Sequence, residues 1–189
     1  DLGDLISLGQ HPLIDELYLA RAQAYLDDKN YAAAEVDART LVELYPGSKK
    51  KGGALLVRLA VAWDQKRYRT AADLITQLRQ ITEEGRLRAE LGVLLAEAYF
   101  RAEDYRNAAD TYAAALYEMP AVAPAGTLIF QRVLADIRAD QLDAAARQLD
   151  EAAANPNFDL QSRWQAEWNL VKEMQLRGQT KAAQARVEK

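Results

Sequence analysis

Cysteine is absent from the 189 residues, which excludes disulfides, thiolate metal sites and cysteine nucleophiles. This absence is compatible with the cytosol and with the periplasm, so it does not select a compartment. Histidine occurs once, as His11, and a single imidazole forms neither a histidine metal cluster nor a histidine relay. His11 is expected in the entry turn before Pro12.

Long apolar runs and an excess of basic residues are also missing. No run approaches the roughly 18 apolar residues that a membrane-spanning helix needs, and the chain does not begin with the residue order of a signal peptide. The formal net charge is −4. We therefore expect no broad attraction to nucleic acid and no direct membrane insertion, while protein partners stay open.

One short phrase recurs at a constant interval. It consists of a polar turn, an aromatic residue or leucine, and a small residue three positions later. The copies begin 37 residues apart, at Tyr31, Tyr68, Tyr105, Leu142 and Gln179. Apolar residues at three- and four-residue steps surround the copies. The sequence therefore predicts an all-α, right-handed solenoid of about five helix hairpins.

Proline, glycine and polar turns indicate where the units begin and end. Residues 1–10 form a short N-terminal segment, and residues 11–189 form the repeat domain. Its units are expected at about residues 11–48, 49–84, 85–121, 122–157 and 158–189. Because the chain begins with Asp1 and ends within a helical pattern, we expect a fragment or a processed form of a longer protein.

Two units carry the residue order of a known helical repeat. The first holds Tyr18, Arg21, Ala22, Tyr25, Ala34, Ala38, Leu41 and Pro46, and the third holds Gly92, Leu95, Ala96, Tyr99, Ala108, Tyr112, Ala115 and Pro120. In this order the chain resembles the tetratricopeptide repeat (TPR) family. The small residues Ala22, Ala34, Ala96 and Ala108 would let the two helices of a hairpin approach closely.

The other units depart from the TPR pattern. The fourth has Val133 where a small residue is usual and Asp136 where tyrosine is usual, and the fifth matches only around Ala182. The interval of 37 also exceeds the usual spacing of about 34 residues. This lengthening, with the phrase at residues 44–48, is similar to TPR proteins of the bacterial envelope. This resemblance favours a location in the periplasm or cell envelope, and a cytoplasmic location stays an alternative.

Charged clusters favour solvated turns over chemistry. Asp27-Asp28 and Glu83-Glu84 fall on predicted turns, where neighbouring side chains diverge. The basic run at residues 49–51 precedes two glycines without a phosphate-loop pattern. We therefore predict no catalytic residue, no cofactor and no metal ion, and we expect that the protein is not an enzyme.

The resemblance implies a concave groove, formed by the first helices of successive units, in which partners of TPR proteins usually lie. Its slots fall on Glu16, Leu19, Gln23, Leu26, Glu90, Val93, Glu97, Phe100, Phe130, Leu134 and Ile137. The second unit adds Leu56 or Val57, and Ala60 or Val61. TPR proteins that grip a C-terminal carboxylate use lysine and asparagine at these slots, so no carboxylate clamp is expected.

An apolar groove with acidic edges suits an amphipathic helix, or an extended apolar segment, that carries basic residues. The sequence therefore predicts a protein-interaction scaffold, with a structural spacer or self-associating scaffold as the alternative. Trp164 and Trp168 stand four residues apart on one helical face. We expect their rings to pack in the core against the fourth unit, with an exposed docking edge as the alternative.

Overall fold

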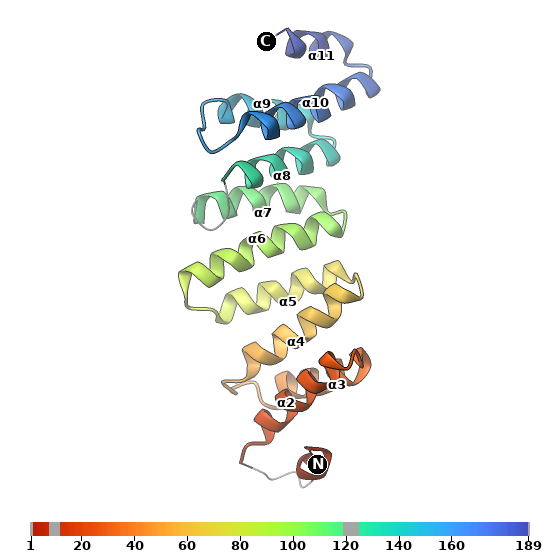
Figure 1. Ribbon diagram of the computed structural model, residues 1–189, viewed down its shortest axis with the longest axis vertical. Coiled ribbons are helices and arrows are strands. Elements are labelled where there is room, and N and C mark those ends of the chain that lie inside the picture. Colours follow the sequence, from red (N-terminus) through yellow and green to blue (C-terminus); the bar gives the residue numbers. More distant parts are fainter. Residues whose placement is uncertain (1, 8–11, 119–124, 189) are drawn as a thin grey trace. The chain divides into compact units, whose positions relative to one another are not determined.

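The computed structural model describes residues 2–7, 12–118 and 125–188, and all regular structure within these ranges is α-helical. Figure 1 shows the helices in chain order. They are α1 Leu2–Ser7, α2 Ile14–Asp27, α3 Tyr31–Leu44, α4 Lys51–Asp64, α5 Tyr68–Ile81, α6 Gly85–Arg101, α7 Tyr105–Glu118, α8 Ala125–Arg138, α9 Leu142–Ala152, α10 Leu160–Leu176 and α11 Thr180–Val187. The prediction of an all-α chain is confirmed. His11 and Pro120, both expected beside turns, lie outside the described residues.

The helices from α2 to α11 form five consecutive pairs, and each pair is joined by a short turn. In the first four turns one residue has a φ between 57° and 62°; these residues are Lys29, Lys66, Glu103 and Asp140. The residue after each of them donates its backbone N–H to a carbonyl five residues earlier, at 2.7 to 2.9 Å. The first helix of each of these four pairs therefore ends with the same turn, every 37 residues, as the recurring phrase predicted.

The fifth pair departs from this interval by one residue. Gly178 has the positive φ, at 75°, and Gln179 donates its N–H to the carbonyl five residues earlier. The second helix begins one residue after Gln179, and Ala183 is buried whereas Ala182 is exposed. The sequence register that placed Gln179 and Ala182 in the repeat is therefore wrong by one residue, because the first helix of this pair ends one residue later.

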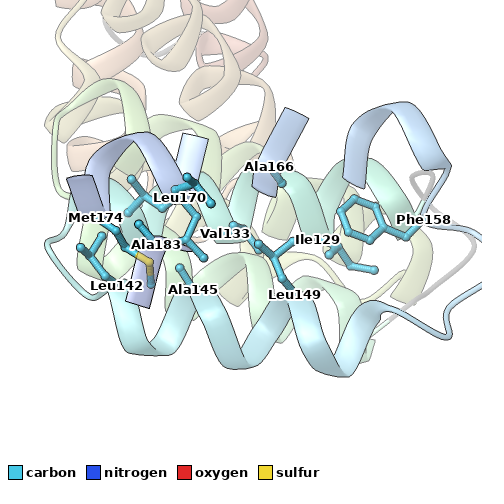
Figure 2. Close-up of a cluster of buried hydrophobic side chains, with 12 residues drawn as sticks. Ile129, Val133, Leu142, Ala145, Leu149, Phe158, Ala166, Leu170, Met174 and Ala183 are labelled. Carbon is cyan, nitrogen blue, oxygen red and sulfur yellow. The ribbon is translucent and has the colours of Figure 1, made fainter. Parts of the chain in front are cut away.

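A buried alanine stands at the same place in the second helix of every pair. Ala34, Ala71, Ala108, Ala145 and Ala183 are each at most 1% exposed. Alanine leaves room for the partner helix to approach closely, and larger side chains fill the space beside the contact. Figure 2 shows this arrangement around Ala145 and Ala183, where α8, α9, α10 and α11 all contribute to one apolar cluster.

Contacts divide the chain into two compact units, residues 1–83 and 84–189. The first contains α1 to α5, and one of its clusters joins α2, α3 and α4 around Leu41. The second contains α6 to α11, with one cluster around Tyr112 and another around Val133. Within the described ranges, no helix has both the length and the apolar character needed to cross a membrane.

An ion pair links α2 and α3 inside the first unit. Arg21 donates from Nε and Nη2 to the two carboxylate oxygens of Asp37, at 2.6 and 2.7 Å. Asp37 is buried, and the Arg21 guanidinium carbon lies 5.9 Å from the ring centres of Tyr18 and Tyr25. The hydrogen bond to Asp37 raises the pKa of Arg21. Removing either residue would therefore leave the charge of the other without its ion-pair partner.

Replacing Asp37 with alanine should lower the free energy of unfolding by about 3 kcal/mol, because the Arg21 guanidinium loses its charged partner. Asp73→Ala, at an exposed position of α5, is the matched control and should change it by less than about 0.5 kcal/mol. Urea unfolding followed by circular dichroism measures both values. Equal losses for the two variants would contradict the importance of the buried pair.

Asp136 on α8 is buried, and its Oδ2 atom has no hydrogen-bond partner within the described part of the chain. Burial raises the pKa of Asp136; the positive charges of Arg132 and Arg147 oppose this rise, and the negative charge of Asp110 adds to it. The folded protein therefore holds a proton on this carboxyl group more tightly than the unfolded chain does. The ionised form destabilises the fold at neutral pH, and this destabilisation is relieved as the pH falls through the raised pKa.

Asp136→Asn should stabilise the protein at neutral pH by about 1 kcal/mol, because it removes a buried charge and keeps the shape of the side chain. This advantage over the unsubstituted protein should shrink as the pH falls from neutral through the raised pKa of Asp136, because the carboxyl group itself then becomes neutral. Thermal unfolding of both proteins across this range gives the difference. An advantage that grows as the pH falls would show that the ionised carboxylate stabilises the fold.

Candidate interaction surface

The helices α6 and α8 are the first helices of the third and fourth pairs, and both lie within residues 84–189. Together they line a shallow pocket of about 430 Å³. Its walls are formed by Glu90, Val93, Leu94, Glu97, Tyr112, Thr127, Leu128 and Gln131. Three of these residues, Glu90, Val93 and Glu97, occupy slots that the TPR resemblance assigned to a groove. The structure brings these three side chains onto one surface, which we call the α6–α8 pocket.

The other five lining residues lie outside the slots that the TPR resemblance assigned to a groove. Thr127 stands 37 residues after the predicted slot Glu90, so the repeat interval contained the signal that could have found it. Tyr112 was expected only in the contact between two helices. Its ring is buried in that contact, and it also lines the pocket.

A hydrogen bond connects the core to the edge of the α6–α8 pocket. The Tyr112 hydroxyl donates to Glu97 Oε2 at 3.0 Å. Burial, together with the charge of Glu97, raises the pKa of Tyr112 far above its ordinary value, so the phenol stays protonated. Glu97 also accepts from Arg101 Nε at 2.7 Å, and Glu90 accepts from Arg86 Nε at 3.0 Å. The pocket therefore offers carboxylate acceptors whose charge is partly neutralised by arginines on the same helix.

The other predicted slots within residues 84–189 are more buried than the sequence suggested. Phe100 is half-buried and packs edge-on against Tyr105, with ring centres 5.2 Å apart. Phe130 and Leu134 are also half-buried, and Phe130 packs against the cluster drawn in Figure 2. Ile137 is only 5% exposed and belongs to that cluster. The prediction of Ile137 as a surface anchor is therefore wrong, because side chains of α9, α10 and α11 share the cluster that buries it.

In the first unit the predicted slots lie on α2. Glu16 is exposed and pairs with Lys50 Nζ at 3.2 Å, and Gln23 is also exposed. Leu19 packs against α4, where a Cβ atom on Gly53 would come within 2.9 Å of the Leu19 Cδ2 atom. Glycine at this position therefore permits the close approach of the two first helices.

The other predicted slots within residues 1–83 lie on α2 and α4. Leu26 is half-buried and packs against the cluster that joins α2, α3 and α4. On α4, Leu56 is exposed and Ala60 is half-buried, whereas Val57 and Val61 are buried. The register that the sequence left open is therefore the one in which Leu56 and Ala60 face outward.

Trp164 and Trp168 contradict the expectation of core packing. Each is 67% exposed on α10, whereas Ala166 and Leu170 are buried in the cluster of Figure 2. Two residues along a helix correspond to a rotation of about 200°, so the tryptophans lie on the opposite side from that cluster. The exposed position, which was the alternative interpretation, is the one that the structure shows.

The acidic pairs lie where the sequence placed them, at the ends of helices and beside turns. Asp27, Asp28, Glu83 and Glu84 are all exposed. Across the described residues, no three histidine, cysteine, aspartate or glutamate side chains gather as the ligands of a metal ion would.

Comparison of the fold with solved structures finds helical repeat proteins. A tetratricopeptide repeat protein from Parabacteroides merdae is 14% identical, with a TM-score of 0.59, and the match covers 91% of this chain and 63% of that one. The nearly identical TPR-like repeats of a putative kinesin light chain from Podosopora anserina are 16% identical, with a TM-score of 0.56 and coverages of 95% and 94%. RapI in its apo form is 9% identical, with a TM-score of 0.55 and coverages of 97% and 84%.

No protein-family model matches the chain, and no curated protein matches its sequence. At the identities found, the structural likeness concerns the fold alone. The chain has an all-α, TPR-like helical-repeat fold, which confirms the resemblance read from its motifs.

Glu97 accepts the hydrogen bond of the Tyr112 hydroxyl and also carries a negative charge at the pocket edge, and substitutions separate these two roles. Glu97→Gln keeps an acceptor for the Tyr112 hydroxyl and should leave the free energy of unfolding within about 0.5 kcal/mol of its original value. Glu97→Ala leaves the buried hydroxyl without that acceptor and should lower the free energy by about 1 to 2 kcal/mol. Urea unfolding of both variants measures the difference. Equal stabilities would mean that this hydrogen bond does not contribute to the fold.

Proposed function

We propose that this protein is a non-catalytic interaction scaffold whose α6–α8 pocket binds a segment of a partner protein. The observation that carries the proposal is the convergence of Glu90, Val93 and Glu97 with Tyr112 on one surface. The pocket has apolar walls, and carboxylates lie among its lining residues. Such a surface suits the apolar side chains of a helix or of an extended segment.

The charges around the pocket define the class of partner. Glu90 and Glu97 accept hydrogen bonds from arginines, yet each carboxylate keeps an exposed portion. A basic residue of the partner can approach these carboxylates while its apolar side chains contact Val93 and Leu94. We therefore infer an amphipathic or extended apolar partner segment with basic residues. Its apolar anchors supply the affinity, and its charges mainly affect selection and the rate of encounter.

The chemistry of the pocket supports a binding role over a catalytic one. Tyr112 is held protonated and hydrogen-bonded to Glu97, while Glu97 and Glu90 are paired with arginines. Catalysis of acyl or phosphoryl transfer needs a nucleophile, a positioned base and a group that stabilises developing charge. The lining residues of this pocket do not supply that combination.

A blocking substitution tests the pocket directly. Peptides selected by phage display against the purified chain provide the ligand, and fluorescence anisotropy measures their affinity. Thr127→Arg places a large cation on the pocket wall and should weaken binding by about 1 to 3 kcal/mol, which is about tenfold or more. Thr76→Arg, at an exposed position of α5, is the matched control and should bind normally.

Selected peptides that bind Thr127→Arg as tightly as the unsubstituted protein would show that the pocket is not the binding site. The alternative of a self-associating scaffold makes a different prediction. Light scattering would then show a mass that rises with protein concentration, and no peptide would be enriched by display.

A further inference from the structure

We propose that the outer side of the last helix pair docks an acidic amphipathic helix of a partner protein, at a site distinct from the α6–α8 pocket. The site, which we call the tryptophan face, consists of Trp164 and Trp168 on α10 and Val187 on α11. These residues line a pocket of about 640 Å³ and are 67%, 67% and 71% exposed. Large apolar side chains gathered on one exposed surface are typical of an interaction site.

The third helix pair shows what covers this face elsewhere in the same chain. The helices α6 and α10 both have 17 residues, and they begin 75 residues apart (160 − 85). The second helices α7 and α11 also begin 75 residues apart (180 − 105). Trp164, Trp168 and Val187 therefore correspond to Ala89, Val93 and Tyr112.

In the third pair, the corresponding Tyr112 and Val93 contact a cluster that the next helix, α8, shares. Ala89 and Tyr112 are buried, and Val93 packs against the cluster that contains Tyr112. The covering helix α8 contributes Leu128 and Ala135 to this cluster, and these two residues are seven positions apart on one helical face. The tryptophan face of the fifth pair thus corresponds to a surface that contacts a following helix in the third pair, two repeats earlier.

The tryptophan face is held in place by an ion-pair network between three helices. Arg186 on α11 donates to both carboxylate oxygens of Glu167 on α10, at 2.8 and 3.0 Å. Arg186 also pairs with Asp150 on α9 at 3.1 Å, and its own side chain is only 8% exposed. The network fixes α11 against α9 and α10, so less ordering is needed when a partner binds. The single positive charge of Arg186 offsets one of the two carboxylate charges beside the face.

The charged residues that line this pocket carry a net positive charge, because the three cations Arg163, Lys172 and Arg186 outnumber the two carboxylates Asp150 and Glu167. This excess selects the partner. Lys172 lines the same pocket, is exposed, and forms no ion pair within the described part of the chain. Arg163 also lines it and donates to the Ala153 carbonyl rather than to a carboxylate. A helix with acidic residues beside its apolar stripe complements these cations. A second copy placed symmetrically would instead bring like charges together, which disfavours self-pairing here.

Two synthetic peptides test the proposed partner chemistry. Both have 14 residues, the length of α8, and both carry two leucines seven positions apart on an alanine face. One has glutamates beside that face and the other has lysines. In a Trp63→Phe background, tryptophan emission reports only on Trp164 and Trp168. The glutamate peptide should shift this emission to shorter wavelength and bind about tenfold more tightly than the lysine peptide, with a preference that added salt reduces.

Variants then assign the binding to the tryptophan face. The double variant Trp164→Ala, Trp168→Ala should bind the labelled glutamate peptide about tenfold or more weakly in fluorescence anisotropy, with unchanged helicity because both rings are exposed. Leu44→Ala, at an exposed apolar position of α3, is the matched control. Lys172→Glu should favour the lysine peptide over the glutamate peptide. Thr127→Arg should leave this binding unchanged, which separates the site from the α6–α8 pocket.

Each contrary result would overturn the proposal. Equal affinity for the two peptides would contradict the preference for an acidic partner. Normal binding by the double tryptophan variant would show that the tryptophan face is not the binding site. Loss of binding in Thr127→Arg would assign the peptide to the α6–α8 pocket instead. Sedimentation that shows a dimer in the unsubstituted protein, but not in the double tryptophan variant, would mean that a second copy covers the face.

Discussion

Every helix pair depends on one close contact, in which an alanine of the second helix meets the first helix. The five alanines at this position, Ala34, Ala71, Ala108, Ala145 and Ala183, are buried in the described structure. A larger side chain would push the helices apart or force its neighbours into unfavourable rotamers. The small residue instead lets the surrounding leucines and rings interlock, and the turn with a positive φ precedes it at a constant distance.

The same contact determines which side chains remain available to a partner. Packing of α7 against α6 and α8 buries Ala96, Ala108 and most of Tyr112, while Val93 and Glu97 stay at the surface. Tyr112 belongs to both regions, because its ring lies in the core and its hydroxyl donates to Glu97. The binding proposed for the α6–α8 pocket would thereby depend on the packing of the helix pair beneath it.

Local spacing predicted the helix pairs and most of their contacts, because a repeat of turn, ring and small residue is visible in sequence. It failed where the outcome depends on a neighbouring helix. Ile137 and Trp168 both fit an apolar helical pattern, yet the last helix pair packs over Ile137, and Trp168 has no such cover within the described residues. The fifth register was missed because Ala182 and Ala183 are both alanine, so composition does not show which one is buried.

If the buried alanine sets the spacing of each helix pair, a larger side chain at that position must destabilise the fold, and one comparison of unfolding free energies tests this. Ala108 is buried and Ala114 is exposed on the same helix, so leucine at each position adds the same volume in different surroundings. Ala108→Leu should lower the free energy of unfolding by about 1 to 3 kcal/mol, and Ala114→Leu should change it by less than about 0.5 kcal/mol. Equal stabilities of the two leucine variants would contradict the claim.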